Sequence, residues 1–163
     1  MHTDIDFTNP PRRRTGALAI IRNESGAVLM VQKSYKGGSF GLPGGCANED
    51  EPPHRAFTRE VQEETGLTLA PGRLLVVHYM SRNPETGATE GLNLVWDGGT
   101  VSSESQIILP APAPGEEPEL TSYRFVPLDE VHELAASYTA LRINAAVGVL
   151  SASHLPTAYL VDG

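Results

Sequence analysis

The sequence has a single cysteine, few basic residues and no long apolar run. Cys46 alone cannot form an intrachain disulfide, which excludes a disulfide-stapled secreted scaffold and makes a cytoplasmic location the expectation. Twelve Lys and Arg against twenty Asp and Glu give a net charge of −8, so we expect no nucleic acid polymer and no membrane surface as partner. No stretch approaches the ~18 apolar residues of a membrane-spanning helix, and residues 1–14 lack the apolar core of a signal peptide.

The length and composition fit one globular domain. The chain has 163 residues, of which 40% are hydrophobic, and this is enough to build a buried core. We therefore expect a single domain over 1–163. Residues 1–14 are expected to be a flexible N-terminal arm, because their three consecutive arginines follow two prolines close to a terminus. The sequence leaves a homodimer open.

Alternating and apolar runs predict strands in both halves of the chain. Residues 17–21 and 28–32 flank a turn and suggest a hairpin-like start. Further strands are predicted at 74–79, 92–96 and 123–126, the second of them ending at the turn Asp97-Gly98-Gly99. The glycine-rich stretch 37–45 predicts a loop, with a type II turn at Leu42-Pro43-Gly44-Gly45 that gives Gly44 a positive φ.

Helices are predicted at 53–65, 129–136 and 139–152. The first begins at a pair of prolines, which a first turn tolerates, and ends at Gly66. The last carries Leu141, Ala145 and Val149 on one face, which is expected to be apolar. The proline-rich residues 110–120 predict a loop, because proline cannot donate to a strand ladder.

Three glutamates gather on one side of the first predicted helix. Glu60, Glu63 and Glu64 are spaced i, i+3 and i+4, so their carboxylates face one way beside the apolar Phe57 and Val61. Such a cluster in a last turn opposes the helix dipole and suggests a cationic partner such as a divalent metal. A solvated acidic face with a plain Arg59–Glu63 surface ion pair would explain the same pattern.

The segment from Gly45 to Leu67 resembles the signature of the Nudix hydrolase family, also described as MutT-like. That signature reads G-x5-E-x7-R-E-U-x-E-E-x-G-U, in which U is aliphatic. Nine residues of this chain fill its specified positions: Gly45, Glu51, Arg59, Glu60, Val61, Glu63, Glu64, Gly66 and Leu67. The resemblance implies an α/β fold of the α+β kind, with a mixed β-sheet sandwiched between helices.

The resemblance also implies an activity: a metal-dependent pyrophosphohydrolase that cleaves a nucleoside diphosphate linked to another moiety, with Mg2+ or Mn2+ as cofactor. Carried over by position, Glu60, Glu63 and Glu64 would be metal ligands together with the Gly45 carbonyl, and Arg59 would orient a glutamate. Oxygen ligands of this kind suit Mg2+. The expected partner is a small-molecule nucleotide.

The general base has two candidate locations. Glu60 in the signature is the first choice, and Glu119 in the proline-rich loop resembles a downstream glutamate that completes the metal site in some members, with Glu116 and Glu117 as rivals. Glu51 would either favour the helix N-terminus electrostatically or act in the outer shell of the site. Of the histidines, His54, His78 and His132 lack metal-ligand spacing and receive no role.

The substrate and even the catalytic role have alternatives. A nucleoside triphosphate, ADP-ribose, a dinucleotide and a nucleotide sugar all fit, and Pro84, near a position associated with ADP-ribose hydrolysis in the family, is interpreted first as a turn residue. A Nudix-fold nucleotide sensor or interaction module without turnover is the main alternative. The intact signature favours the enzyme over it.

Overall fold

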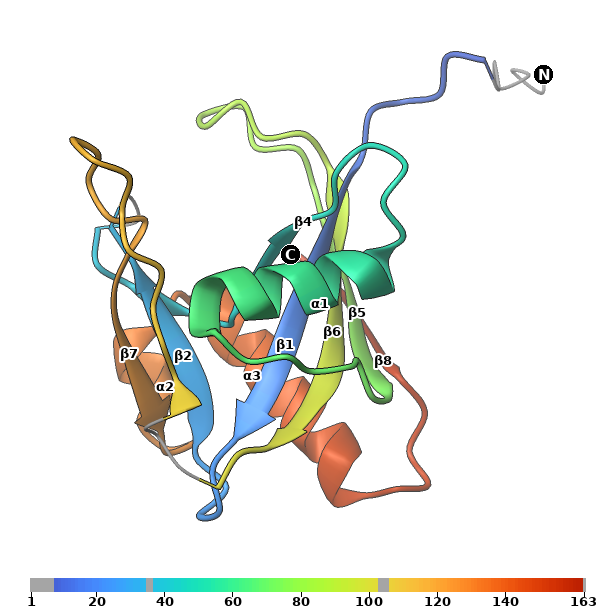
Figure 1. Ribbon diagram of the computed structural model, residues 1–163. Coiled ribbons are helices and arrows are strands. Elements are labelled where there is room, and N and C mark those ends of the chain that lie inside the picture. Colours follow the sequence, from blue (N-terminus) through green and yellow to red (C-terminus); the bar gives the residue numbers. More distant parts are fainter. Residues whose placement is uncertain (1–7, 35–36, 103–105, 163) are drawn as a thin grey trace.

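A computed structural model describes residues 8–34, 37–102 and 106–162, in which eight strands form one mixed sheet with helices on both of its faces (Figure 1). The elements are, in chain order, β1 (Arg14–Arg22), β2 (Val28–Lys33), β3 (Phe40–Gly41), β4 (Gly44–Cys46), α1 (Pro53–Thr65), β5 (Leu74–Met80), β6 (Gly91–Thr100), β7 (Leu120–Val126), α2 (Val131–Leu134), α3 (Ser137–Ser151) and β8 (Ala158–Val161).

The strands follow the order β3-β2-β1-β6-β5-β8, and β4 and β7 add to β1 and β2 respectively. β1 runs parallel to β6, and β5 runs parallel to β8, while the remaining pairs are antiparallel. The long β1 strand is therefore the centre of the fold, with β6 along one edge and both β2 and β4 along the other. This arrangement places the glycine-rich β4 directly beside β1.

Helices α1 and α3 cover opposite faces of the sheet, so the predicted sandwich is confirmed (Figure 1). Successive side chains of a strand point to opposite faces, and β1 supplies both cores in this way. Its Ala17, Ala19 and Ile21 pack with the buried side of α1, whereas Ile20 packs with α3. The α1 contribution comes from Ala56, Phe57 and Val61, each completely buried.

Helix α1 has the predicted bounds. Pro53 occupies its first turn, where a missing N–H costs nothing, and Gly66 ends it in the left-handed conformation with φ 73°. The Gly66 N–H donates to the Gln62 carbonyl at 2.9 Å. Phe57 and Val61 face the core, as their spacing from the glutamates predicts, so the acidic side of α1 faces β4.

The predictions for the glycines are partly wrong. Gly44 has the expected positive φ of 129°, but residues 44–46 form the short strand β4 on β1 rather than a loop. The predicted turn at Asp97-Gly98-Gly99 is a bulge inside β6, which continues to Thr100. The Asp97 side chain stabilises this bulge, because its Oδ1 accepts hydrogen bonds from the Gly99 N–H and from Arg22.

Helix predictions in the C-terminal part also need correction. The predicted 129–136 helix is the four-residue α2. Of the face predicted on α3, Leu141 is wrong, because it is 46% exposed, whereas Ala145 and Val149 do pack against the core. Ile143 and Ala146 complete the buried side of α3. Strand β8, which joins the sheet by parallel pairing with β5, has only four residues and was not predicted.

The segments 8–13 and 106–119 contain no strand and no α-helix. Arg13 pairs with Glu90, and the Arg14 N–H donates to the Glu90 carbonyl, so the end of the predicted arm is attached to the start of β6; residues 1–7 lie outside the described part. The loop predicted at 110–120 has no strand or helix from 110 to 119, but Leu120 already begins β7. Ile107, just before this loop, is buried against the α1 core. Within the described ranges, no helix is long and apolar enough to cross a membrane.

Candidate functional site

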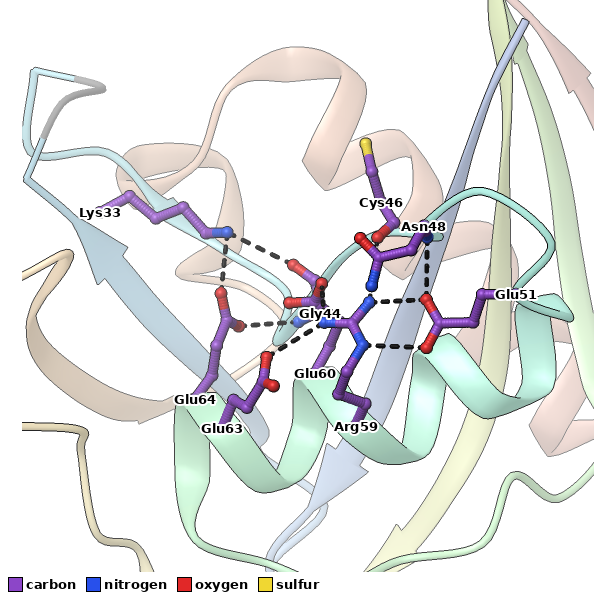
Figure 2. Close-up of polar contacts among 9 residues, drawn as sticks. All are labelled: Lys33, Gly44, Cys46, Asn48, Glu51, Arg59, Glu60, Glu63 and Glu64. Carbon is purple, nitrogen blue, oxygen red and sulfur yellow. Dashed lines mark hydrogen bonds and ion pairs between the residues drawn. The ribbon is translucent and has the colours of Figure 1, made fainter.

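The acidic side of α1 meets the backbone of β4 at Gly45 (Figure 2). A Cβ at this glycine would lie 2.5 Å from both oxygens of the Glu60 carboxylate, much closer than real contacts. The absence of a side chain at position 45 therefore leaves the space that Glu60 occupies. The Glu60 side chain is 16% exposed, so its carboxylate is largely shielded from solvent.

Arg59 holds three of the signature glutamates in place (Figure 2). Its Nε and Nη2 donate to the two oxygens of Glu51 at 2.9 and 2.8 Å, a bidentate pair. Its Nη1 donates to Glu60 at 2.7 Å and to Glu63 at 3.0 Å, and Nη2 also reaches the Cys46 carbonyl at 3.2 Å. The prediction that Arg59 orients a carboxylate is consistent with these contacts.

The Arg59 contacts explain the ionisation of Glu51. Hydrogen bonds from Arg59 and from the Asn48 N–H lower the pKa of Glu51 to about 2, and the carboxylates of Glu51, Glu60 and Glu63 raise the pKa of Arg59. Glu51 lies before the helix and not in its first turn. Its contact with Arg59 therefore supports the outer-shell role over a role at the helix N-terminus.

Glu64 has a different environment, at the buried end of the acidic side. Its side chain is 6% exposed; one oxygen lies 2.8 Å from Lys33 Nζ, and the other accepts from the Gly44 N–H at 2.7 Å. Burial raises the pKa of Glu64, and the Lys33 charge and the Gly44 N–H oppose this rise. Lys33 also donates to the Gly44 carbonyl at 3.3 Å. Lys33 and Glu64 together therefore hold both backbone polar groups of Gly44, the first residue of β4.

A groove of about 1390 Å³ runs past these residues. Gly45, Glu60, Glu63 and Glu119 are among its lining residues, whereas Arg59 and Glu64 support the lining from behind. Glu119 is exposed and directly precedes β7, and its carbonyl accepts from the Ser34 N–H at 2.9 Å. The structure thus brings the downstream glutamate to the same groove as the signature residues.

The donor set of this groove fits Mg2+ or Mn2+. Within the described residues, no three His, Cys, Asp or Glu side chains form a ready-made metal cage. Mg2+ does not need one, because it is usually held by one or two carboxylates together with waters and substrate phosphates. Arg59 contacts one oxygen each of Glu60 and Glu63, which leaves the second oxygen of both carboxylates for a cation.

Several residues of this region were missed by the sequence reasoning. Lys33 ends the apolar β2 run, but the sequence contains no signal that pairs it with Glu64 on a distant helix. His78 received no role, yet it is completely buried and its Nδ1 accepts a hydrogen bond from Arg142 Nε at 2.9 Å. Arg142 and Asn93 also line the groove, on the side away from Glu60. Only the fold brings these residues together.

The comparisons with known proteins agree with this geometry. The family model described as NUDIX domain matches residues 12–143. A MutT-like protein of Streptomyces ambofaciens is 27% identical over 138 residues, which are 85% of this chain and 79% of that protein. The CMP-5'-(N-acetyl-N-hydroxy-3-aminopropyl)phosphonate hydrolase of Streptomyces rubellomurinus is 26% identical over 140 residues, 83% of this chain and 62% of that protein.

A solved structure shows the same fold. The crystal structure of the MutT protein from Methanosarcina mazei superposes with a TM-score of 0.67 at 26% identity, covering 89% of this chain and 98% of the other. The family model spans most of the chain and includes every strand and helix from β1 to α2. The chain therefore belongs to the Nudix hydrolase family.

Proposed function

We propose that this hydrolase is a metal-dependent pyrophosphohydrolase of small nucleotides, cleaving a nucleoside diphosphate linked to another moiety. The observation that carries the proposal is the placement of Glu60 and Glu63 beside Gly45 on one groove wall, with Arg59 fixing both carboxylates. A nucleoside triphosphate, ADP-ribose or a related nucleotide fits a groove of this size. Its phosphates also fit the site, because a metal ion would offset their charge in a protein of net charge −8.

The proposed ligand set of Mg2+ or Mn2+ is the Gly45 carbonyl with Glu60, Glu63, Glu64 and Glu119. Glu60, Glu63 and Glu119 line the groove, whereas Glu64 would bind a metal only if Lys33 withdrew from it. When bound, a divalent metal ion stabilises the charge on the attacking and leaving oxygens. Arg59 contributes by positioning Glu60 and Glu63 through its donors, and it does not touch the substrate itself.

Glu60 is the proposed general base. Its carboxylate is shielded, held at one oxygen by Arg59, and borders the groove beside the β4 backbone, where it can accept a proton from an attacking water. Glu119 is the competing candidate, since it reaches the groove from the opposite loop. An exposed side chain without a positioning partner such as Arg59 is held less firmly, which favours Glu60.

The relatives support the substrate class. The Streptomyces rubellomurinus relative is by name a hydrolase of a phosphonate joined to CMP, that is, of a nucleotide linked to another phosphorus-bearing group. We extend this class to the present chain as small nucleotides with a phosphoric anhydride bond. Pro84 lines the same groove next to Asn83, whose Oδ1 caps the turn by accepting from the Glu85 and Thr86 N–H groups.

The proposal is tested by turnover coupled to phosphate release, with Mg2+ or Mn2+. The panel contains nucleoside triphosphates, ADP-ribose, dinucleoside polyphosphates and nucleotide sugars, and a phosphatase reveals products that are not orthophosphate. We expect Glu60→Gln and Glu63→Gln to lower kcat by about 100-fold or more with an unchanged fold, because each removes a ligand or the base. If Glu60 is the base, Glu119→Gln should lower kcat by a smaller factor than Glu60→Gln.

Glu133→Gln, which removes an exposed glutamate of α2 outside the groove, serves as the matched control and should retain wild-type kcat. If Glu119→Gln lowers kcat more than Glu60→Gln does, Glu119 and not Glu60 is the general base. Absence of wild-type turnover across the panel would contradict the proposal and favour a nucleotide sensor.

A further inference from the structure

A buried arginine without a counter-anion lies on the groove wall away from Glu60. Arg142, on α3, is 7% exposed and lines the groove. Among residues 8–34, 37–102 and 106–162, no carboxylate lies within 4.0 Å of its guanidinium, although the protein has an excess of acids. A buried charge is costly unless it is paired, so this position needs an explanation.

Two neutral groups hold the Arg142 guanidinium in place instead. Its Nε donates to His78 Nδ1 at 2.9 Å, and its Cζ lies 5.1 Å from the ring centroid of Tyr138. Both contacts orient the guanidinium, but neither neutralises its charge. Burial lowers the pKa of Arg142 to about 10, so the side chain remains protonated at pH 7.

Asn93 adds an unused donor to the same wall. Asn93 is only 6% exposed, and its Nδ2 has no hydrogen-bond partner in the part of the chain that the structure describes. Asn93 is directly opposite His78 in the β5–β6 register, so the two side chains share one face of the sheet. Gly16 gives the amide its room, since a Cβ there would lie 2.3 Å from Asn93 Oδ1.

A second arginine lies near Arg142. Arg14 lines the groove here, and its charge acts on Arg142 by lowering its pKa. The acid on the same wall, Asp162, is bound to Ser81, whose N–H and O–H donate to its two oxygens at 2.7 and 3.0 Å. Ser81 thus holds the Asp162 carboxylate, and this acid forms no ion pair with Arg142 among the described residues.

The register of the sheet gives the distance between this wall and Gly45. Gly45 pairs with Ala17 on β1, and the neighbouring Gly16 pairs with Asn93 on β6. Two interstrand spacings correspond to roughly 10 Å in the plane of the sheet. Gly45, Asn93 and Arg142 line the same groove, so one nucleotide derivative can reach both places although α1 and α3 cover opposite faces of the sheet.

We infer that Arg142 and Asn93 form an anion subsite that binds a second negatively charged group of the substrate, a phosphate monoester or a carboxylate, away from the diphosphate. The location of the diphosphate beside Gly45 rests on the proposed function. His78 is a positioning residue in this subsite, because it holds the arginine without facing the ligand. The substrate class narrows accordingly to nucleoside diphosphate derivatives that carry an additional anionic group.

Metal-free calorimetry in EDTA tests the subsite without turnover, using two matched ligand pairs. ADP-ribose is compared with ADP-ribose 2′-phosphate, and UDP-glucose with UDP-glucuronate, so the pairs differ by a phosphate monoester and a carboxylate respectively. We expect the wild type to bind the more anionic member of at least one pair roughly 10- to 100-fold more tightly, as charge-assisted hydrogen bonds allow. The pair that shows the preference identifies the anion.

Substitutions show which residues cause the preference for the more anionic ligand. Arg142→Met should abolish it, Arg142→Lys should keep part of it because the charge remains without the fork, and Asn93→Asp should abolish it by supplying an internal carboxylate. Arg124→Met removes an arginine that is 51% exposed and outside the groove, and it should leave the preference intact. If Arg142→Met fails to fold, as judged by its thermal melt, the Asn93→Asp and Arg142→Lys variants show whether the preference for the more anionic ligand depends on this subsite.

The anion subsite and the hydrolase activity are tested by different outcomes. A wild type without preference in either pair, or an Arg142→Met variant that weakens both members of a pair equally, would overturn the subsite even if turnover is found. Conversely, a preference that depends on Arg142, combined with absence of turnover, would establish the subsite in a binding protein.

Discussion

At the scale of single residues, two cations with different partners organise the site. Arg59 contacts three glutamates while remaining 28% exposed, whereas Lys33 and Glu64 form a buried pair. An exposed ion pair is worth little, but a buried one becomes costly when one partner is removed. The two cations are therefore expected to respond differently to substitution.

Lys33→Met should destabilise the fold by about 3 kcal/mol at pH 7, because it leaves the Glu64 carboxylate buried without its cation. The loss should become smaller as the pH is lowered, because burial raises the pKa of Glu64 and a protonated Glu64 no longer needs the charge. Urea unfolding at pH 7 and at lower pH measures the loss. The double variant Lys33→Met/Glu64→Gln should recover most of the loss, and a double variant as unstable as the single one would contradict the pairing.

The Glu51–Arg59 pair predicts a pH dependence of stability. The pKa of Glu51 falls from 4.5 to about 2 on folding, so the unfolded state binds more protons between these values. The pair therefore contributes stability above about pH 4.5, and this contribution is lost as the pH falls toward 2. Glu51→Gln should unfold at lower urea than the wild type at pH 7, and the difference should shrink steadily below pH 4.5.

The control for this titration is Glu24→Gln, which changes an exposed glutamate in the β1–β2 turn. It should follow the wild-type stability curve at every pH. If Glu51→Gln loses the same amount of stability at pH 7 and at pH 3, the variant acts through packing and not through the charge.

At the scale of elements, the site depends on how closely β4 approaches its neighbours. Two adjacent glycines serve different contacts in this strand. A Cβ at Gly44 would lie 2.1 Å from the Ala17 carbonyl oxygen, a rigid backbone atom, whereas a Cβ at Gly45 would meet the movable Glu60 carboxylate. The first glycine therefore sets strand pairing, and the second sets the position of Glu60.

Alanine at the two positions should separate these roles. Gly44→Ala should cost about 3 kcal/mol of stability, because a side chain at φ 129° is strained and clashes with β1. Gly45→Ala should cost roughly 1 kcal/mol but lower kcat about 100-fold by displacing Glu60. Thermal melts and turnover measure both effects. Equal losses of stability in the two variants would contradict this assignment.

At the scale of the whole molecule, residues from three distant segments of the chain line one groove. Glu119 comes from the segment before β7, Glu60 from α1 and Arg142 from α3, on opposite faces of the sheet. A ligand that binds only the folded protein stabilises it by mass action. Metal binding is therefore measurable on the intact molecule without a substrate.

Mg2+ or Mn2+ at about 100 times its dissociation constant should raise Tm by roughly 5–10 °C, the shift that ~2.7 kcal/mol gives in a domain of this size. The double variant Glu60→Gln/Glu63→Gln should lose most of this shift. Differential scanning fluorimetry measures it, with NaCl at matched ionic strength as the control. An unchanged wild-type Tm would favour a solvated acidic face with a coincidental signature.

Much of this architecture could be predicted from local patterns. The bounds of α1 follow from Pro53 and Gly66, and the burial of Phe57 and Val61 follows from helical spacing. The bulge of β6 was misread as a turn, because paired glycines after an aspartate are the usual signal of a turn. The short β4 and β8 strands carry too few residues for a periodic pattern to emerge.

The sequence by itself determined the family, the acidic side of α1 and the nine signature positions, because these depend on spacing within one continuous segment. Only the tertiary structure decided which cation faces which acid. Lys33 meets Glu64, and Arg142 meets His78 and none of the acids that the structure describes, because strand order and helix packing bring distant segments together. Such contacts between distant segments leave no periodic trace along the chain, so the groove and its anion subsite could be inferred only from the fold.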